Sequence, residues 1–301
     1  MTDPFFEVGA ITDEFSPGDL DRALGAMGDL GMTFAELRVV GGRNIIDHTD
    51  AEIDAVRETI EARGMRVLSI ASPVLKCALP DAPPVAPHIQ QDMFSSASGF
   101  DDQPRLARRA FEIAERMGAR IVRVFSYWRT IDPDACFERV SSALRELADE
   151  GLKRNLIVGI ENEHACNIAT GAETARLLAA VDHPALRVIW DPANAFVTGE
   201  TPYPQGYAHL PLSRIVHVHA KDCTVTDHVP TWGPLGEMGI DWRGQLAALA
   251  GDGYRGTISL ETHWKGPNGD KFQGSIICGR NLGQMVLETK NEKRILKRDQ
   301  T

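Results

Sequence analysis

The chain has 301 residues, of which 43% are hydrophobic and 25% are charged, which is ordinary for a globular domain. Its formal net charge of −10 repels phosphate backbones, so no nucleic-acid partner is expected. No stretch approaches the roughly 20 apolar residues that a membrane span requires, so no membrane partner is expected either. The N-terminal stretch lacks a basic region and an apolar core, and the five cysteines form no CxxC pair. These features predict a cytoplasmic protein with reduced thiols.

Short runs rich in Val and Ile recur along the chain, and each is separated from the next by room for one helix. The predicted strands cover residues 8–15, 34–40, 66–72, 120–126, 156–162, 187–192, 215–221 and 256–262. Strands that alternate with helices pair in parallel. Eight such units predict an α/β fold, a (β/α)8 TIM barrel that forms a single domain over residues 1–301. A doubly wound open sheet is the alternative, but no Gly-rich phosphate loop follows the first strand.

Apolar residues recur at helical spacing in several of the connecting segments. The clearest predicted helices cover residues 19–31, 50–64, 103–118 and 132–151. Aspartates at their starts and glycines at their ends are typical helix caps and stops. The predicted caps are Asp19, Asp50 and Asp132, and the predicted stops are Gly31, Gly64, Gly118 and Gly151.

Two segments do not fit the repeating pattern. Residues 73–102 contain five prolines and show no clear helix or strand. A loop of this length is usually functional, and because it follows the third strand it would rise over the C-terminal end of the barrel. It is therefore predicted to be a lid over a substrate. An insertion without a role is the alternative. Residues 290–301 are polar and basic, which predicts a frayed tail or an extension of the last helix.

Four acidic or imidazole side chains stand near the ends of the last four predicted strands, in the order Glu161, Asp191, His219 and Glu261. The C-terminal ends of barrel strands lie on one face, where the active sites of such barrels are built. Carboxylate oxygens with one imidazole suit a single divalent metal ion, with Mn²⁺ expected and Co²⁺, Mg²⁺ or Zn²⁺ also compatible. Such an ion can polarise the carbonyl of a sugar. The two glutamates come from separated strands, so one can remove a proton beside the carbonyl and the other can return it.

The motifs around these residues resemble those of the sugar isomerase and epimerase family with a xylose-isomerase-like TIM barrel, over about residues 8–290. The matching motifs are IENEH, WDPANA, HVHAKD, GPLGEMGIDW and LETHW. The resemblance implies that Glu161, Asp191, His219 and Glu261 bind one divalent metal and that the two glutamates are catalytic. It implies a small sugar or polyol as substrate, proton transfer through an enediolate, and a homodimer or homotetramer.

The family also contains dehydratases and lyases that act on inososes or 3-keto-glycosides, so these reactions are the alternative to isomerisation. A non-catalytic sugar-binding barrel is a further alternative. The stretches SPVLK, ENEH and THWKGPNGDK depart from the ketose epimerase pattern. The related type IV apurinic endonucleases have a histidine where this chain has Asn194 and an Asp-x-His pair where it has Asp227 and His228 side by side. DNA repair is therefore not expected.

Further residues are candidates for substrate contact, each with a structural alternative. Glu36 and Arg38 share one face of the second strand and line the pocket floor or form a structural ion pair. Lys76 holds a substrate oxygen or is a solvated loop lysine, and His164 binds a hydroxyl or is a loop histidine. The other candidates for substrate contact are Asn194, Lys221, Glu237 and the two tryptophans Trp128 and Trp264, which stack on a sugar or simply pack. His217 is expected deeper in the barrel, and Asp241 is expected to cap a helix.

Overall fold

The computed structural model describes residues 6–91, 98–227 and 229–298. Eight parallel strands close into a barrel in the order β1-β12-β9-β8-β7-β6-β5-β2, so the predicted TIM barrel is confirmed. The barrel strands are β1 Glu7–Ile11, β2 Phe34–Leu37, β5 Arg66–Ile70, β6 Ile121–Val124, β7 Ile157–Glu161, β8 Leu186–Trp190, β9 Ile215–Ala220 and β12 Thr257–Leu260. They are almost entirely buried, as is usual for parallel strands that helices cover.

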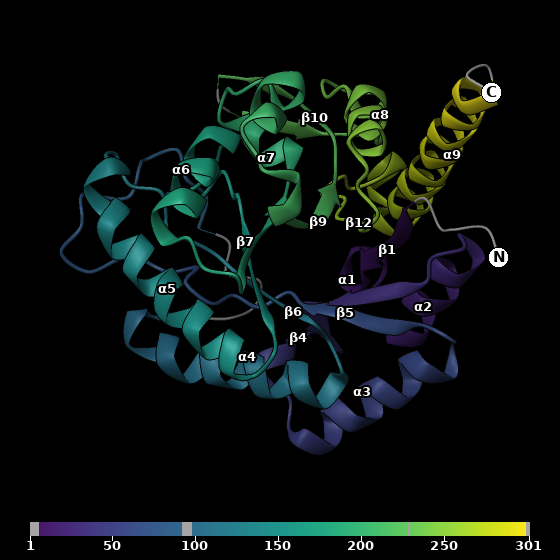
Figure 1. The fold of residues 1–301 in the computed structure, drawn as a ribbon. Helices are drawn as coiled ribbons and strands as arrows, with labels where there is room; N and C mark the ends of the chain where they lie inside the picture. The colour runs from purple at the N-terminus through teal and green to yellow at the C-terminus, as the bar shows by residue number, and fades with distance from the viewer. Residues whose placement is uncertain (1–5, 92–97, 228, 299–301) are drawn as a thin grey trace.

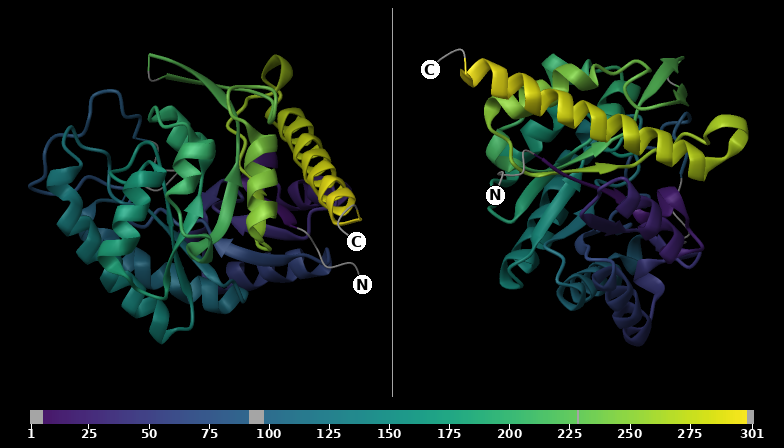
Figure 2. Two further views of the ribbon diagram at one scale, coloured as in Figure 1. Left: turned by 45° about the horizontal axis from the view of Figure 1, so that its top comes forward. Right: turned by 90° about the vertical axis from the view of Figure 1, so that its right-hand side faces the viewer.

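The helices surround the barrel (Figure 1). They are α1 Thr12–Phe15, α2 Leu20–Asp29, α3 Asp50–Ala62, α4 Gln103–Met117, α5 Phe137–Lys153, α6 Gly171–Val181, α7 Pro192–Val197, α8 Trp242–Asp252 and α9 Lys271–Arg298. Short helical turns lie at Ile45–Asp47, Phe100–Asp102, Asp134–Cys136, Pro202–Gly206, Leu212–Arg214 and Pro267–Gly269. Figure 2 shows α9 as a long helix along the outside of the barrel, where it packs against α8 and α1. No helix in the described ranges is long and apolar enough to cross a membrane.

Two small hairpins interrupt the repeating pattern. The predicted second strand, 34–40, divides into β2 and β3 Val39–Val40, and β3 pairs with β4 Arg43–Asn44. The other hairpin, β10 Cys223–Thr226 with β11 Val229–Trp232, follows β9. The first strand is also shorter than the predicted range 8–15, because the chain turns into α1 at Thr12. The polar residues of α1 are thereby directed toward the buried Arg38 rather than along the sheet.

Helix ends differ from the predictions at three places. Asp132 does not cap α5, which begins at Phe137 after the turn Asp134–Cys136, although Asp132 accepts from the Ala135 backbone in that turn. The cap of α3 is Thr49 and not Asp50. The Thr49 hydroxyl accepts a hydrogen bond from the Glu52 backbone N–H, and the Glu52 carboxylate accepts one from the Thr49 backbone N–H. Gly151 does not stop α5, which continues to Lys153 before Asn155 takes a positive φ.

The other predicted helix ends are confirmed. Asp19 caps α2, and Asp241 caps α8. The predicted stops at Gly31, Gly64 and Gly118 all have positive φ.

The long connection after β5 is packed rather than extended from the barrel where it is described. Val74, Leu75 and Cys77 are buried, and the backbone of Ala86 donates to Arg129 after β6 at 2.9 Å. Residues 92–97 of the predicted lid lie outside the described residues, so the lid function stays a prediction. The predicted tail 290–301 continues α9 as far as residue 298, and residues 299–301 also lie outside the description.

The capping box of α3 gives a prediction for stability. Replacing Thr49→Ala removes the oxygen that accepts from the Glu52 backbone, so we expect a loss of about 1 kcal/mol in the free energy of unfolding. Urea denaturation measures the change. Thr59→Ala, the same substitution inside the same helix, is the control and is expected to be neutral or slightly stabilising. An equal loss in both variants would contradict the capping assignment.

Candidate metal centre

The four side chains singled out from the sequence meet at the C-terminal end of the barrel. Glu161 ends β7, Asp191 follows β8, His219 lies near the end of β9 and Glu261 follows β12. Each offers one ligand atom, and these atoms all lie within 4.8 Å of one another. All four side chains are buried. The adjacent ends of parallel strands bring them together from sequence positions up to 100 residues apart, as the strand alternation requires.

Two carboxylate oxygens in this set are buried without a hydrogen bond: Glu161 Oε2 and Asp191 Oδ2. Cations approach both, Arg123 Nη1 at 3.1 Å from Glu161 and Lys221 Nζ at 2.8 Å from Asp191. Buried carboxylates with incomplete hydrogen bonding are expensive unless a cation balances them. Three hard oxygen donors and one imidazole therefore fit a divalent ion. A thiolate site does not fit, because no cysteine belongs to this group.

The charges of the group strongly perturb its titration. Burial raises the pKa of Asp191 to about 7, an effect that Lys221 opposes and the neighbouring glutamates reinforce. Burial also acts against a charged imidazole, yet the carboxylates Glu161 and Glu36 raise the pKa of His219 well above its ordinary value. Burial acts to raise the pKa of Glu261, but Lys221 and His219 hold that pKa well below its ordinary value. A closely spaced acidic group in a dry site retains cations, whether protons or metal.

Each catalytic candidate is held by an arginine inside the barrel. Arg38 donates from Nη1 to Glu261 Oε1 at 2.9 Å, and it also binds Asp13 and Glu14 of α1. Arg123 on β6 lies 3.1 Å from Glu161. The sequence analysis missed Arg123, although an arginine in the middle of an apolar strand run is a signal that a buried partner exists. Glu36 is not paired with Arg38 and instead contacts His217 and His219.

Beside the metal set, a second group of polar side chains lies at the ends of β7 and β8. Asn194 Nδ2 lies 3.4 Å from Glu161 Oε1 and 3.4 Å from Glu163 Oε2, and its Oδ1 lies 2.8 Å from His164 Nδ1. Burial acts to raise the pKa of Glu163, but Lys76 and His164 lower it to about 2. The sequence analysis missed Glu163. Lys76 is buried, with Nζ 4.5 Å from the Phe125 ring centroid, so the solvated-lysine interpretation is wrong.

A cavity of about 380 Å³ opens next to this group. Its walls come from the loop after β5, the loop after β7, the β10–β11 hairpin and the segment after β12. They include Lys76, His88, Glu163, His164, Trp232 and His263. The size is within the range of small-molecule sites. The structure therefore brings Lys76 and His164 of the predicted contacts to one cavity beside the metal set, and adds Trp232 and His263, which the sequence analysis did not single out.

Lys76 and His164 line this cavity and the other seven predicted substrate contacts do not; three of the seven also have no contact with the metal set. Trp128 is 2% exposed and packs in the core with Phe125 and Cys166, so the packing alternative holds for it. Trp264 packs against the main core. Glu237 is exposed and accepts from Asn281 of α9 at 3.0 Å, which ties the 233–242 turn to that helix. Lys221 does reach inward as predicted, and its ammonium lies 2.8 Å from both Asp191 and Glu261.

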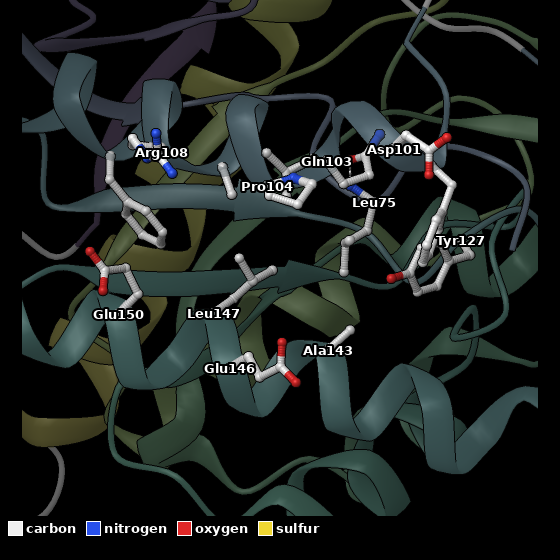
Figure 3. Close-up of a pocket in the computed structure, with 14 residues that line it drawn as sticks. Leu75, Asp101, Gln103, Pro104, Arg108, Tyr127, Ala143, Glu146, Leu147 and Glu150 are labelled. Atoms are coloured by element: carbon white, nitrogen blue, oxygen red, sulfur yellow. Dashed lines mark hydrogen bonds between the residues drawn. The ribbon is translucent and has the colours of Figure 1, made fainter.

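A larger hollow lies elsewhere and does not include the metal set. Figure 3 shows this hollow of about 600 Å³ between α4 and α5, outside the barrel, with Arg108 and Pro104 on one side and Leu147 and Glu150 on the other. None of the four metal-set residues lines it, so volume alone does not mark the chemistry of this chain.

Comparison with known proteins identifies the family. The family model of the xylose isomerase-like TIM barrel matches residues 24–282, so the chain belongs to this family. Two curated relatives are named 3-dehydroshikimate dehydratase. The one from Pseudomonas putida is 29% identical over 167 residues, which cover 52% of this chain and 25% of the relative. The one from Pseudomonas aeruginosa is 28% identical over 200 residues, which cover 63% of this chain and 30% of the relative. The chain thus spans well under half of the length of these relatives.

Solved structures share the fold over nearly the whole chain. L-ribulose 3-epimerase has a TM-score of 0.71 at 15% sequence identity. The superposition covers 97% of this chain and 98% of the epimerase chain. A xylose isomerase-like TIM barrel protein from Mycobacterium smegmatis, in complex with magnesium, has a TM-score of 0.66 at 16% identity, with coverages of 96% and 98%. At these identities the likeness establishes the barrel and nothing finer.

A bound ion should stabilise the folded chain. A free Mn²⁺ concentration of about 100 times its Kd adds about 2.7 kcal/mol to the free energy of unfolding, so we expect the thermal midpoint to rise. Asp191→Asn should abolish the rise, because the amide still accepts from Asn194 but loses the ligand charge. Asp241→Asn is the control, since Asp241 caps α8 in the same way and should keep the rise. A full Mn²⁺ shift in Asp191→Asn would contradict the assignment.

Metal binding should also depend on pH. In the metal-free protein the pKa of Asp191 is about 7, so below that pH an arriving ion must displace its proton. Apparent affinity should therefore fall as the pH drops below about 7. Calorimetric titration with Mn²⁺ in two buffers of different ionisation enthalpy counts the protons released. We expect more released protons at pH 6 than at pH 8, and equal numbers would show that Asp191 is already ionised.

Proposed function

We propose that this member of the xylose isomerase-like TIM barrel family is a divalent-metal-dependent isomerase or epimerase that moves a proton at the carbon next to a carbonyl of a sugar or polyol. The observation that carries the proposal is the convergence of Glu161 and Glu261 on Asp191 and His219. The two glutamates come from β7 and β12, which β8 and β9 separate in the barrel. A substrate carbon between them would have a proton acceptor on one side and a donor on the other.

The chain's own contacts prepare each glutamate for this role. Arg38 holds Glu261 Oε1 at 2.9 Å, while Oε2 of the same carboxylate faces Lys221 and His219. Arg123 lies beside Glu161 Oε2, and Oε1 faces His219. A carboxylate fixed at one oxygen can present the other in a defined direction, which supports proton transfer at a defined carbon.

The bound ion would supply a Lewis acid that polarises the substrate carbonyl and acidifies the neighbouring C–H bond. Glu161, Asp191, His219 and Glu261 would hold it, with Mn²⁺ our first choice and Co²⁺, Mg²⁺ and Zn²⁺ compatible with the same donors. The neighbouring cavity offers Lys76 and His164 to substrate hydroxyls or to a carbonyl oxygen. Removal of the carbon-bound proton would give an enediolate, and its return to the other face or to the next carbon would complete epimerisation or isomerisation.

A dehydratase or lyase is the second candidate, and the observation that favours it is the name shared by the two curated relatives, 3-dehydroshikimate dehydratase. Such a reaction begins with the same proton removal but then expels a β-hydroxyl or an alkoxide, which leaves with a proton. His164 lines the cavity, and its Nδ1 donates to Asn194 Oδ1 at 2.8 Å. In the imidazolium form the other ring nitrogen also carries hydrogen, and it is then the candidate donor of that proton.

Proton NMR in D₂O separates these reactions from simple binding. The Mn²⁺-loaded protein is incubated with ketoses, inososes, 3-keto-glycosides and 3-dehydroshikimate, and the metal is removed before spectra are taken. Deuterium beside the carbonyl with a new isomer supports isomerisation or epimerisation. Loss of water or of an aglycone supports the second candidate. Substrates that bind without any exchange or elimination would contradict both and leave a sugar-binding barrel.

Glu261→Gln tests the proposed acid and base directly. The amide cannot accept the proton, so we expect a loss of about 10²-fold or more in turnover with the fold retained. Because Glu261 is also a proposed ligand, turnover is measured at a metal concentration that saturates the variant. Glu237→Gln is the control, since that glutamate is exposed, lies away from the metal set and accepts a hydrogen bond from Asn281. Normal turnover by Glu261→Gln would remove Glu261 from the reaction.

A further inference from the structure

A second layer of buried polar side chains lies beneath the metal set. Glu36 on β2 is completely buried, and its Oε1 lies 2.9 Å from His217 Nε2 and 3.2 Å from His219 Nε2. Its other oxygen accepts a hydrogen bond from Ser69 of β5. On the far side of His217, Nδ1 lies 2.6 Å from Thr257 Oγ1 of β12. Four barrel strands thus contribute to one hydrogen-bonded cluster that contains none of the proposed catalytic groups.

The donors and acceptors of this cluster can be assigned in one consistent way. A carboxylate has no proton to give, so Glu36 accepts from all three of its partners. Both imidazoles must then carry hydrogen on Nε2. A neutral imidazole with hydrogen on Nε2 accepts at Nδ1, and for His217 the acceptor is satisfied by the hydroxyl of Thr257. Every polar atom of this inner cluster has a partner without any additional ion.

His219 differs from His217 at its other nitrogen. Its Nδ1 lies 3.1 Å from Glu161 Oε1 and 3.4 Å from Glu261 Oε2, and both of these atoms are acceptors when ionised. A lone pair on Nδ1 would face two carboxylate oxygens, so this nitrogen needs either a proton, which makes the ring an imidazolium, or a metal ion in its place. The inner cluster therefore determines which nitrogen of His219 the metal set receives.

A second metal ion within Glu36, His217 and His219 is the competing explanation, since their ligand atoms also lie within 4.8 Å of one another. It would require His219 to bind one ion through each nitrogen and so to lose both ring protons. It would also displace the hydrogen bonds that both imidazoles make to Glu36. The hydrogen-bonded cluster needs neither change.

We propose that Glu36 is a positioning residue that, together with His217, fixes the ring orientation and tautomer of His219, so that Nδ1 is offered to the divalent ion. The inference rests on the metal centre of the proposed function but not on the reaction catalysed there. Carboxylates that bind the outer nitrogen of a ligating histidine raise its basicity and orient it, and losing them typically weakens metal binding by 10–100-fold.

Histidine tautomers in the unaltered protein are the first test. The ¹⁵N-labelled protein is loaded with Zn²⁺, which is diamagnetic, and long-range ¹H–¹⁵N correlation spectra assign each ring nitrogen. We expect hydrogen on Nε2 of both His217 and His219, and a zinc-induced shift at Nδ1 of His219. Hydrogen on Nδ1 of His219, or a zinc shift at its Nε2, would overturn the proposal without the need for any variant.

Glu36→Gln is the second test, read by calorimetric Zn²⁺ titration. The amide introduces a donor among three donors, so we expect a Kd about 10–100-fold higher than in the unaltered protein and a change in the His219 tautomer signals. Ser69→Ala is the matched control, because it removes one bond to Glu36 and leaves Oε1 in place, and its Kd should stay within about threefold. An unchanged Kd in Glu36→Gln would contradict the proposal. So would a stoichiometry of two zinc ions per chain in the unaltered protein and one in Glu36→Gln, which would indicate a second metal site at Glu36.

These readouts separate the inference from the proposed function. Zinc affinity and tautomers are measured without substrate, so a protein that shows both expected results but no exchange in D₂O retains the role of Glu36 and loses the isomerase proposal. An active enzyme whose zinc affinity is indifferent to Glu36→Gln retains the proposed function and loses the inference.

Discussion

The concentration of buried negative charge at the C-terminal end of the barrel is the constraint on which the rest of the site depends. Glu36, Glu161, Asp191 and Glu261 are all at most 2% exposed. A buried carboxylate without a partner costs several kcal/mol, so each must be balanced locally. The barrel provides the balance from its own strands: Arg38 after β2, Arg123 from β6, Lys221 after β9 and the imidazoles of β9. The proposed divalent ion, held by Glu161, Asp191, His219 and Glu261, would add to the same balance.

The sequence was sufficient for the barrel and for the four central residues because both follow from one-dimensional patterns. Parallel strands that alternate with helices align their C-terminal ends, so residues at those ends must converge whatever the details of packing. Arg123 and the partners of Arg38 did not follow from such a pattern, because contact between separate strands across the barrel interior depends on shear and register. Asp13 and Glu14 were hidden in a predicted strand that the structure ends at Ile11.

Local sequence patterns at the start of α3 distinguish the two candidate caps. Thr49 and Asp50 are both good capping residues, but only Thr49 has a glutamate three positions later, and Glu52 completes the reciprocal bonds. Asp50 would have needed a partner at Ile53, which is buried in the core. For Trp128 and Trp232 no comparable local rule exists. Whether a strand-end tryptophan faces the core or a cavity is decided by loops distant in sequence, and here Trp232 lines the cavity while Trp128 is covered.

The division between strands and loops explains why the sequence predicts the metal set but does not predict the substrate. The proposed metal ligands and their supports, Glu36 and His217, stand on barrel strands or directly after them, where the hydrogen-bonded sheet fixes them. The walls of the adjacent cavity come instead from segments between the barrel strands, including the loop that contributes His88 and the hairpin that contributes Trp232. Connections tolerate change far better than buried strands do. Under the proposed function, changes confined to these connections could redirect the proton transfer between epimerisation and elimination while the strand-borne residues stay the same.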